Sequence, residues 1–497
     1  MQQALYLPGM SVQPDNHYQL ISALFIRLLG VIYLIAFVSI STQIEGLAGS
    51  QGILPIAEKL AWLNAEGGVT RWFQVPTLFW LNASDAALSG VAIAGIVVSL
   101  FIVAGRLTRP ALVTAFVFYL SLYHAGALFM NFQWDGLLLE AGFLAIFLTP
   151  RSRVVILLFR WLLFRLRFSS GLSKLTSQDP TWANLTALDY YFEVQPLPTP
   201  LAWWAHQLPE WLLRSGTLGT LVVELIVPFM MFLPRRWRFT AAWITIFWQI
   251  LIILTSNHNW INFLTIILCL FLFDDRALRS TLPTRFLAAL RPPSVDEPAR
   301  FQTLRQAMVA VLASLILFAS GTHFRELATM QPVTGVMGTM LDYAENWRVV
   351  NSYHVFPTMN TQRIELEISG SMDDVNWKTY QFRYKPGELT TRPKLVLPLQ
   401  PRLDWQMWFV TLSPRFMPLF HSFLERLLQG SIAVTALLAD NPFADEPPRF
   451  IRVQAWRYRF SSPELRDQTG QWWQREPLGA FTPLPILEKS GFSADDS

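Results

Sequence analysis

Long apolar runs dominate the first two thirds of the chain and constrain its fold more than any other feature. Nine runs come near the length of a helix that spans a bilayer, which takes about 20 residues. They lie at about 20–44, 86–105, 110–128, 136–149, 154–172, 217–233, 240–256, 260–273 and 307–321. Only 15% of the residues are charged, against about 25% in ordinary soluble domains. We therefore predict an α-helical polytopic membrane domain with about nine transmembrane helices.

Arginine residues are unevenly distributed between the connections of these runs. If the runs alternate across the bilayer, the arginine-rich connections fall on one side, which the positive-inside rule assigns to the cytoplasm. They contain Arg106, Arg109, Arg151, Arg153, Arg235, Arg236, Arg238 and the 274–306 stretch. The N-terminus is then cytoplasmic and the C-terminal domain extracytoplasmic. This predicts a multi-pass protein of the plasma (inner) membrane, or of the endoplasmic reticulum membrane in a eukaryote.

Beyond residue 340 the pattern changes, and apolar residues alternate with polar ones as in half-buried strands. Strands are expected at 363–369, 377–384 and 450–460, and helices between 404 and 438. This predicts a β-rich soluble domain, a sheet or sandwich, with a helical insertion. The predicted segments are an N-terminal tail (1–19), a transmembrane domain (20–321), a linker (322–340), an extracytoplasmic β-rich domain (341–485) and a flexible tail (486–497).

Ionisable residues inside the predicted helices are candidates for a functional site, because an unpaired charge is costly in a bilayer. We expect Glu140 and Arg165 to meet as a buried ion pair in the outer half of the membrane. Such a pair either fixes helix packing or forms part of a site. Glu224 precedes Pro228 by four residues, so the proline removes the helical donor for the carbonyl group of Glu224.

Lys174 ends the fifth run, just before a cluster of aromatic and acidic residues. Near a low-dielectric boundary a lysine can serve as a base, whereas at an exposed helix end it acts as an interfacial anchor. Both interpretations remain open. The candidate membrane-embedded polar site comprises Glu140, Arg165, Lys174, Asp189, Tyr190, Glu193 and Glu224.

Several other classes of function lack support in the sequence. It contains no Gly-x-Ser-x-Gly elbow, Walker loop, His-Glu-x-x-His motif or Cys-x-x-Cys pair. His124, His206 and His258 lie near the outer membrane face without metal-ligand spacing, so we expect no metal and no cofactor. No block of like charges resembles a nucleic-acid-binding arm.

Blocks of the sequence resemble the lipase maturation factor family. They include Trp134–Ala145, Leu188–Pro196, Pro401–Phe409, Asn257–Asn262, Asn351–Tyr353 and Trp472–Glu476, within a likeness that spans residues 20–485. The resemblance implies a membrane-bound, chaperone-like folding and maturation factor that assists exported lipases or other secreted proteins. Animal relatives reside in the endoplasmic reticulum membrane, and their C-terminal domain is implicated in engaging the client. The implied role is accessory rather than catalytic.

The aromatic residues of the outer domain could supply client-binding hot spots, or they could form the core of that domain. The candidate client-binding residues are Arg402, Asp404, Trp405, Trp408, Trp472 and Trp473. Animal members carry cysteines at the positions of Thr181 and Ala187, so thiol chemistry in that loop cannot operate here. The lone cysteine, Cys269, favours a bacterial-type member.

A more distant resemblance supports an alternative function. Gly171-x-x-Lys174-Leu is similar to the stretch that carries the base lysine in vitamin K-dependent carboxylase-type membrane proteins. This likeness implies an integral membrane enzyme that acts on a lipid-soluble or membrane-presented substrate, with Lys174 as base and with Glu140 and Arg165 in its site. A transporter is the least favoured class, because no inverted repeat is evident.

Overall fold

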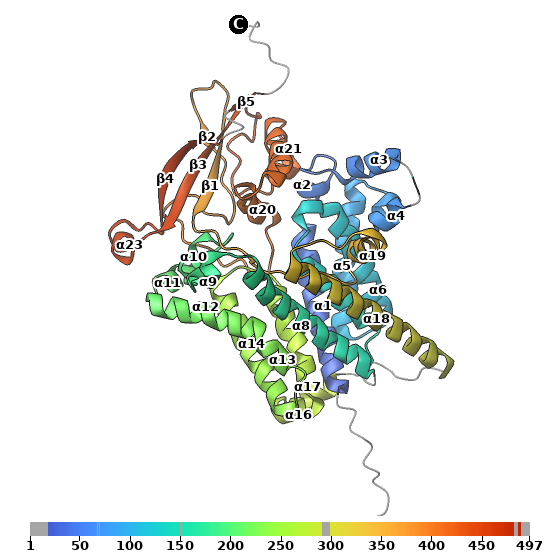
Figure 1. Cartoon of the computed structure of the whole chain (residues 1–497). Coiled ribbons are helices and arrows are strands. Elements are labelled where there is room, and N and C mark those ends of the chain that lie inside the picture. The colour runs from blue at the N-terminus through green and yellow to red at the C-terminus, as the bar shows by residue number, and fades with distance from the viewer. Residues whose placement is uncertain are drawn as a thin grey trace, which may run out of the picture.

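A helical body and a smaller outer domain that carries a β-sheet make up the protein (Figure 1). The computed structural model describes residues 18–66, 68, 70–149, 152–290, 299–481 and 486–488. Most of the predicted N-terminal tail, Arg151, the loop 291–298 and the C-terminal tail beyond residue 488 lie outside the described residues.

Helices form the whole of the body as far as residue 346. They are α1 (Gln19–Ser41), α2 (Ile44–Ala48), α3 (Ile56–Glu66), α4 (Arg71–Gln74), η1 (Leu78–Trp80), α5 (Asp85–Ala104), α6 (Thr108–Gly126), η2 (Ala127–Phe129), α7 (Gln133–Ile146), α8 (Arg153–Thr176), α9 (Pro180–Ala183), α10 (Ala187–Val194), α11 (Pro200–His206), α12 (Glu210–Leu225), α13 (Val227–Met230), α14 (Arg235–Thr255), α15 (Ile261–Leu268), η3 (Cys269–Leu272), α16 (Asp275–Thr281), α17 (Thr284–Ala289), α18 (Ala299–Thr329) and α19 (Gly335–Asn346).

Each of the nine apolar runs contains helical structure, but they are not equally suited to cross a bilayer. Within the described residues, five helices are long and apolar enough to do so. These are Gln19–Ser41, Asp85–Ala104, Thr108–Phe129, Arg235–Thr255 and Thr303–Thr329. The other four runs form shorter or more highly charged helices. The structure therefore establishes several apolar helices without confirming nine spans.

Local sequence signals explain where individual helices begin and end. The Ser84 hydroxyl caps α5 by accepting a hydrogen bond from the Ala87 N–H, at 3.3 Å. Gly105 ends α5 with a left-handed φ of 67°, a conformation that glycine adopts without strain. Pro228 interrupts the sixth run, so α12 ends at Leu225 and α13 begins at Val227.

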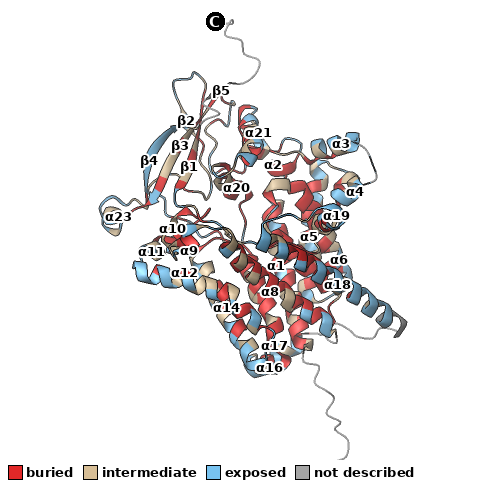
Figure 2. Ribbon diagram, viewed as in Figure 1, coloured by how far each residue is buried: buried red, intermediate tan, exposed pale blue. Residues whose placement is uncertain are grey.

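Burial separates the inner helices of the body from those that line its surface. Figure 2 shows buried residues concentrated along α1 and α8, and many exposed residues along α12, α14 and α18. Many of the exposed side chains are large and apolar, as a lipid-facing surface requires. On α14 and α18 they include Trp237, Trp243, Phe247, Ile250, Leu251, Leu254, Leu304, Met308, Val311, Leu315, Leu317 and Phe318.

A five-stranded antiparallel sheet lies in the outer domain, in the order β2-β1-β3-β4, with β5 also paired to β3. Residues Leu366, Ile368, Ile451 and Val453 form its buried face, against which α20 and α21 pack. The outer domain consists of β1 (Arg363–Ser371), β2 (Lys378–Thr379), α20 (Arg402–Val410), η4 (Pro414–Phe416), α21 (Met417–Leu428), α22 (Ile432–Thr435), β3 (Phe450–Phe460), α23 (Pro463–Thr469), β4 (Trp473–Ala480) and β5 (Ile486–Glu488).

The predicted strands at 363–369 and 450–460 are confirmed, as is the helical insertion. The strand predicted at 377–384 is wrong in its extent, because its ladder with β1 covers Lys378 and Thr379 and ends with one further bond, from the Tyr380 N–H to the Ile368 carbonyl oxygen. Farther along, the Arg383 side chain donates to the carbonyl oxygen of Leu438, in the segment that follows α22, at 3.0 Å. Strand β4 was not predicted.

Candidate functional site

Two carboxylates on the short helix α7 are fully buried, and the first of them is paired with the outer domain. Asp135 accepts two hydrogen bonds from the Arg402 guanidinium, at 2.7 and 2.8 Å. The Tyr119 hydroxyl donates a third hydrogen bond to Asp135, at 2.5 Å. Two parallel bonds from one guanidinium fix both partners in orientation as well as distance. Because Arg402 lies on α20, this ion pair joins the helical body to the outer domain.

Glu140, the second carboxylate of α7, forms an ion pair with Arg165 of α8, so the predicted contact between them is confirmed. The segment that follows α19 supplies the remaining partners. The Tyr353 hydroxyl and the Asn351 backbone N–H donate to Glu140, at 2.8 and 3.0 Å. Arg165 in turn donates to the Asn351 carbonyl oxygen at 3.1 Å. Every charge in this cluster is therefore matched inside the protein.

Lys174 is buried in α8 rather than exposed at a helix end, which excludes a role as a simple interfacial anchor. Its amino group lies 2.9 Å from the Glu224 carboxylate and donates to the Val355 carbonyl oxygen at 2.6 Å. The Arg167 guanidinium lies 3.4 Å from the same carboxylate. The Trp182 ring lies 5.0 Å from the lysine nitrogen. Glu224 thus compensates two buried cations.

The last three residues of the predicted polar site lie on α10, and within the described structure they make no hydrogen bond or ion pair with Lys174 or Glu224. Glu193 accepts a hydrogen bond from the backbone N–H of Phe460, at 2.7 Å, which connects α10 to β3. Burial raises the pKa of Glu193, although this hydrogen bond opposes the shift. Asp189 and Tyr190 are half-buried. The seven predicted residues therefore form three separate groups rather than one site.

Further polar contacts connect the outer domain to the body. Arg363 of β1 donates to the carbonyl oxygens of Gln195 and Pro196, at 2.5 and 2.9 Å. The Trp408 ring N–H donates to the Val194 carbonyl oxygen at 2.7 Å. One hydrophobic core also runs through both parts, from α1 in the body to β1 and α21 in the outer domain. The helical body and the outer domain thus form a single unit, held together by buried polar contacts and a shared hydrophobic core.

Comparison with known proteins identifies the family. Residues 20–280 match the family model described as the lipase maturation factor transmembrane domain, and residues 349–483 match the one described as its C-terminal domain. The chain belongs to the lipase maturation factor family. It is 34% identical to lipase maturation factor 2 of Gallus gallus, over 93% of this chain and 80% of that protein. It is 32% identical to lipase maturation factor 1 of Mus musculus, over 93% of this chain and 86% of that protein. No solved structure matches the chain.

The likeness to vitamin K-dependent carboxylases finds no support in these matches. One lipase maturation factor model covers residues 20–280, including Lys174, and the other covers residues 349–483, including Arg402. Family membership therefore rests on long matches in both parts of the chain, whereas the carboxylase likeness rests on one short stretch around Lys174.

The six residues predicted to contact a client of this lipase maturation factor differ in how far their side chains are exposed. Arg402, Asp404, Trp405 and Trp473 are buried in the protein, so their side chains make internal contacts. Burial raises the pKa of Asp404, although the backbone N–H groups that it binds oppose the shift. Trp408 and Trp472 are half-buried. These last two side chains alone, among the six predicted, reach the surface of the described structure.

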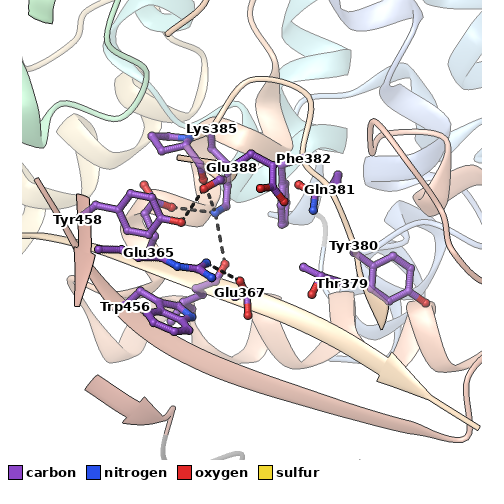
Figure 3. Close-up of a pocket in the computed structure, with 14 residues that line it drawn as sticks. Glu365, Glu367, Thr379, Tyr380, Gln381, Phe382, Lys385, Glu388, Trp456 and Tyr458 are labelled. Atoms are coloured by element: carbon purple, nitrogen blue, oxygen red, sulfur yellow. Dashed lines mark hydrogen bonds and ion pairs between the residues drawn. The ribbon is translucent and has the colours of Figure 1, made fainter. Parts of the chain in front are cut away.

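A shallow groove lies on the polar face of the sheet (Figure 3). Lys385 points to Glu365 across this groove, with 2.8 Å between the charged atoms, and Arg475 pairs with Glu367 at 2.7 Å. The Tyr458 hydroxyl donates to the Gly387 carbonyl oxygen at 2.7 Å and closes one end. These pairs stabilise the sheet and neutralise Glu365 and Glu367 in the lining of the groove.

Across the described ranges, no group of three or more His, Cys, Asp or Glu side chains is arranged to hold a metal ion. The His124 ring donates a hydrogen bond from Nε2 to the carbonyl oxygen of Asn346, the last residue of α19, at 2.9 Å. His258 lies 3.1 Å from the Tyr191 hydroxyl. These two histidines thus make hydrogen bonds to different partners.

Sequence reasoning missed the role of Asp135 and the origin of its partner. Asp135 directly precedes the apolar run 136–149 that contains Glu140, so the cost of a buried charge could have identified it. The partner could not be found in that way, because Arg402 was interpreted as a surface residue. Asn351, Tyr353 and Arg363 were missed as site residues because they too were not expected to be buried partners.

Proposed function

We propose that the protein is a membrane-embedded maturation factor that assists the folding of exported lipases, and that it acts through binding rather than through catalysis. Family membership over both parts of the chain carries this proposal. The relatives in chicken and mouse are themselves named lipase maturation factors. A buried ion pair between α7 and α20 supports the same function, because it holds a client-binding domain rigidly against the membrane part.

The proposed orientation has the N-terminus in the cytoplasm and the outer domain on the opposite side of the membrane. The start of α1 is bound to Asp275 of α16, through the Leu20 backbone N–H at 3.0 and 3.1 Å. Figure 1 has α16 at the end of the body farthest from the sheet. Arg276 and Arg279 on that helix agree with the positive-inside rule. A total of about nine spans satisfies this orientation. The single cysteine supports a bacterial-type plasma membrane as the location.

The proposed client surface is an aromatic–arginine cluster formed by Trp204, Arg466 and Trp472. The Arg466 guanidinium lies 4.8 Å from the Trp204 ring centre and 5.1 Å from that of Trp472. Tryptophan and arginine are the residue types that dominate binding energy in protein interfaces. The cluster lies where α11 of the body meets α23 of the outer domain, so a client bound there would contact both parts.

The test is the activity of a secreted lipase in a host that lacks the gene. The native chain should restore lipase activity, whereas the double variant Trp204→Ala/Trp472→Ala should restore little and should no longer co-purify with the lipase. The matched control is Trp62→Ala, which removes an exposed tryptophan from α3, away from the cluster.

Two results would contradict the proposal at different levels. Normal lipase activity in the deletion strain would rule out lipase maturation. Full rescue by the double variant, at equal amounts of protein in the membrane, would rule out the aromatic–arginine cluster as the client surface.

A further inference from the structure

An apolar patch lies beside the last membrane helix and has no internal partner that buries it. It consists of Trp72 and Phe73 on α4 and of Val336, Met337 and Met340 on α19, all of them exposed. The two helices are in contact, and the rings of Phe73 and Tyr343 meet edge to face at 6.4 Å. The patch is therefore one surface rather than a set of scattered side chains.

The first two turns of α19 have the composition of a membrane-surface helix. Residues 335–341 carry no charge, whereas Asp342 and Glu345 follow toward the C-terminal end. Gly338 and Leu341 are buried, so the opposite side of the helix faces the protein. A helix with one apolar face and no partner for it gains free energy when that face enters the headgroup boundary of a bilayer.

The distance from α18 places this helix at the bilayer. The membrane-spanning part of α18 ends at Thr329, and α19 begins at Gly335. Six peptide units extend to at most about 20 Å, which keeps the start of α19 close to the end of the span. Met330, between the two helices, is also exposed, so an apolar side chain lies in the connection that leads from α18 to the patch.

Polar contacts hold the other end of α19 in place. His323 of α18 lies 3.1 Å from the Glu345 carboxylate. His124 of α6 lies 2.9 Å from the Asn346 carbonyl oxygen. The apolar face of α19 is thus presented by a helix whose C-terminal end is fixed to the two neighbouring helices.

We propose that the α4–α19 patch is a membrane-surface site that is inserted into the outer leaflet, with lipid as its occupant. The short connection to the end of the span of α18 selects a bilayer over a protein partner. The position of Trp72 agrees, because tryptophan side chains accumulate at the level of the headgroups. The site would anchor the chain that leads from α18 to Asn351 and Tyr353, the partners of Glu140.

The test uses the full-length protein in phosphatidylcholine nanodiscs, with a fluorescent NBD label on single cysteines. In a Cys269→Ala background, Val336→Cys and Met340→Cys report on the patch. Val311→Cys on α18 and Val375→Cys in the turn after β1 are matched controls. The exposed fractions of the four native side chains are 75%, 63%, 60% and 76%, so differences in labelling reflect surroundings rather than burial.

We expect phosphatidylcholine with a shallow doxyl group to quench NBD at positions 336 and 340, as at 311, while aqueous iodide quenches it at 375 only. Iodide quenching at 336 and 340 without doxyl quenching would overturn the proposal. If positions 336 and 340 become protected from iodide only after a lipase is added, the patch binds a client rather than lipid. If they are protected only in a dimer fraction, it binds a second copy of the chain, and either result would overturn the proposal. Each labelled variant is compared with the Cys269→Ala parent by gel filtration, and only variants with the elution profile of the parent are scored.

Discussion

Arg402 of α20 and Asp135 of α7 lie 267 positions apart in the chain and form a fully buried, two-bond ion pair. Removal of one partner leaves a buried charge without compensation, which costs about 3–5 kcal/mol, whereas a pair replaced by apolar groups is often tolerated. The pair therefore fixes the position of the outer domain relative to the helical body, and variants that remove it test this role.

We predict that Arg402→Met lowers the free energy of unfolding by about 3–5 kcal/mol. The double variant Asp135→Asn/Arg402→Met should lose less than the sum of the two single variants, because it contains no unpaired charge. Thermal unfolding of the detergent-solubilised protein measures all three. Additive losses would show that the two side chains do not stabilise each other.

The Lys174 cluster predicts unequal effects for its two partners. Glu224→Gln leaves Lys174 and Arg167 without their shared carboxylate and should cost about 3–5 kcal/mol. Lys174→Met keeps the Arg167–Glu224 contact and should cost clearly less. Unfolding temperatures of the two variants provide the comparison, and an equal loss would contradict the arrangement. If Lys174→Met also restores lipase activity in the deletion strain, the lysine is not a catalytic base.

Helix packing predicts the effect of a methyl group at Gly142. A Cβ atom at this position of α7 would clash with the Tyr33 ring and hydroxyl of α1. Gly142→Ala should therefore cost about 1–3 kcal/mol through overpacking. At Gly90 of α5 no atom lies within 4 Å of the added Cβ, and Gly90→Ala should gain up to about 1 kcal/mol from helix propensity. Unfolding temperatures measure both effects. An unchanged value for Gly142→Ala would show that α1 and α7 are farther apart than the structure has them.

Stability of the outer domain should depend on pH through Glu365. Burial by itself raises the pKa of Glu365, but Lys385 and Arg363 outweigh it, and the pKa lies below its usual value of 4.5. A carboxylate with a depressed pKa contributes stability above its unfolded-state value, and this contribution is lost as the pH falls through the folded-state value.

The native protein should therefore lose stability more steeply than Glu365→Gln as the pH falls below 4.5. Unfolding temperatures of both proteins between neutral pH and the acid limit measure the difference. Parallel curves would show that Glu365 titrates alike in the folded and unfolded states.

Sequence periodicity predicted the class of the fold better than its assembly. Apolar runs and alternating residues identify helices and strands because they report burial within one element. They predicted β1 and β3 well. Strand β4 escaped because its residues after Trp473 are exposed and carry no alternation of buried side chains. Nothing local in the sequence reveals which residue comes to lie beside another across hundreds of positions.

The candidate site, too, was predicted only in part. The cost of a buried charge identified Glu140, Arg165, Lys174 and Glu224 as residues that need partners, and each of them has one. The same argument could not distinguish a buried arginine from an exposed one in the outer domain, so Arg402 was expected to face a client. Aromatic content was equally ambiguous, since Trp405 and Trp473 belong to the core.

The pairing of α7 with α20 also imposes an order on biosynthesis. A ribosome delivers the chain from its N-terminus, so α7 reaches the membrane while the codons for Arg402 are still untranslated. Throughout that interval Asp135 lacks its counterion and the helical part is incomplete. A truncated or stalled product therefore exposes a lone carboxylate in an apolar setting, which quality control can recognise. A protein that helps others to mature thus reaches its own native state only when its last third has been made.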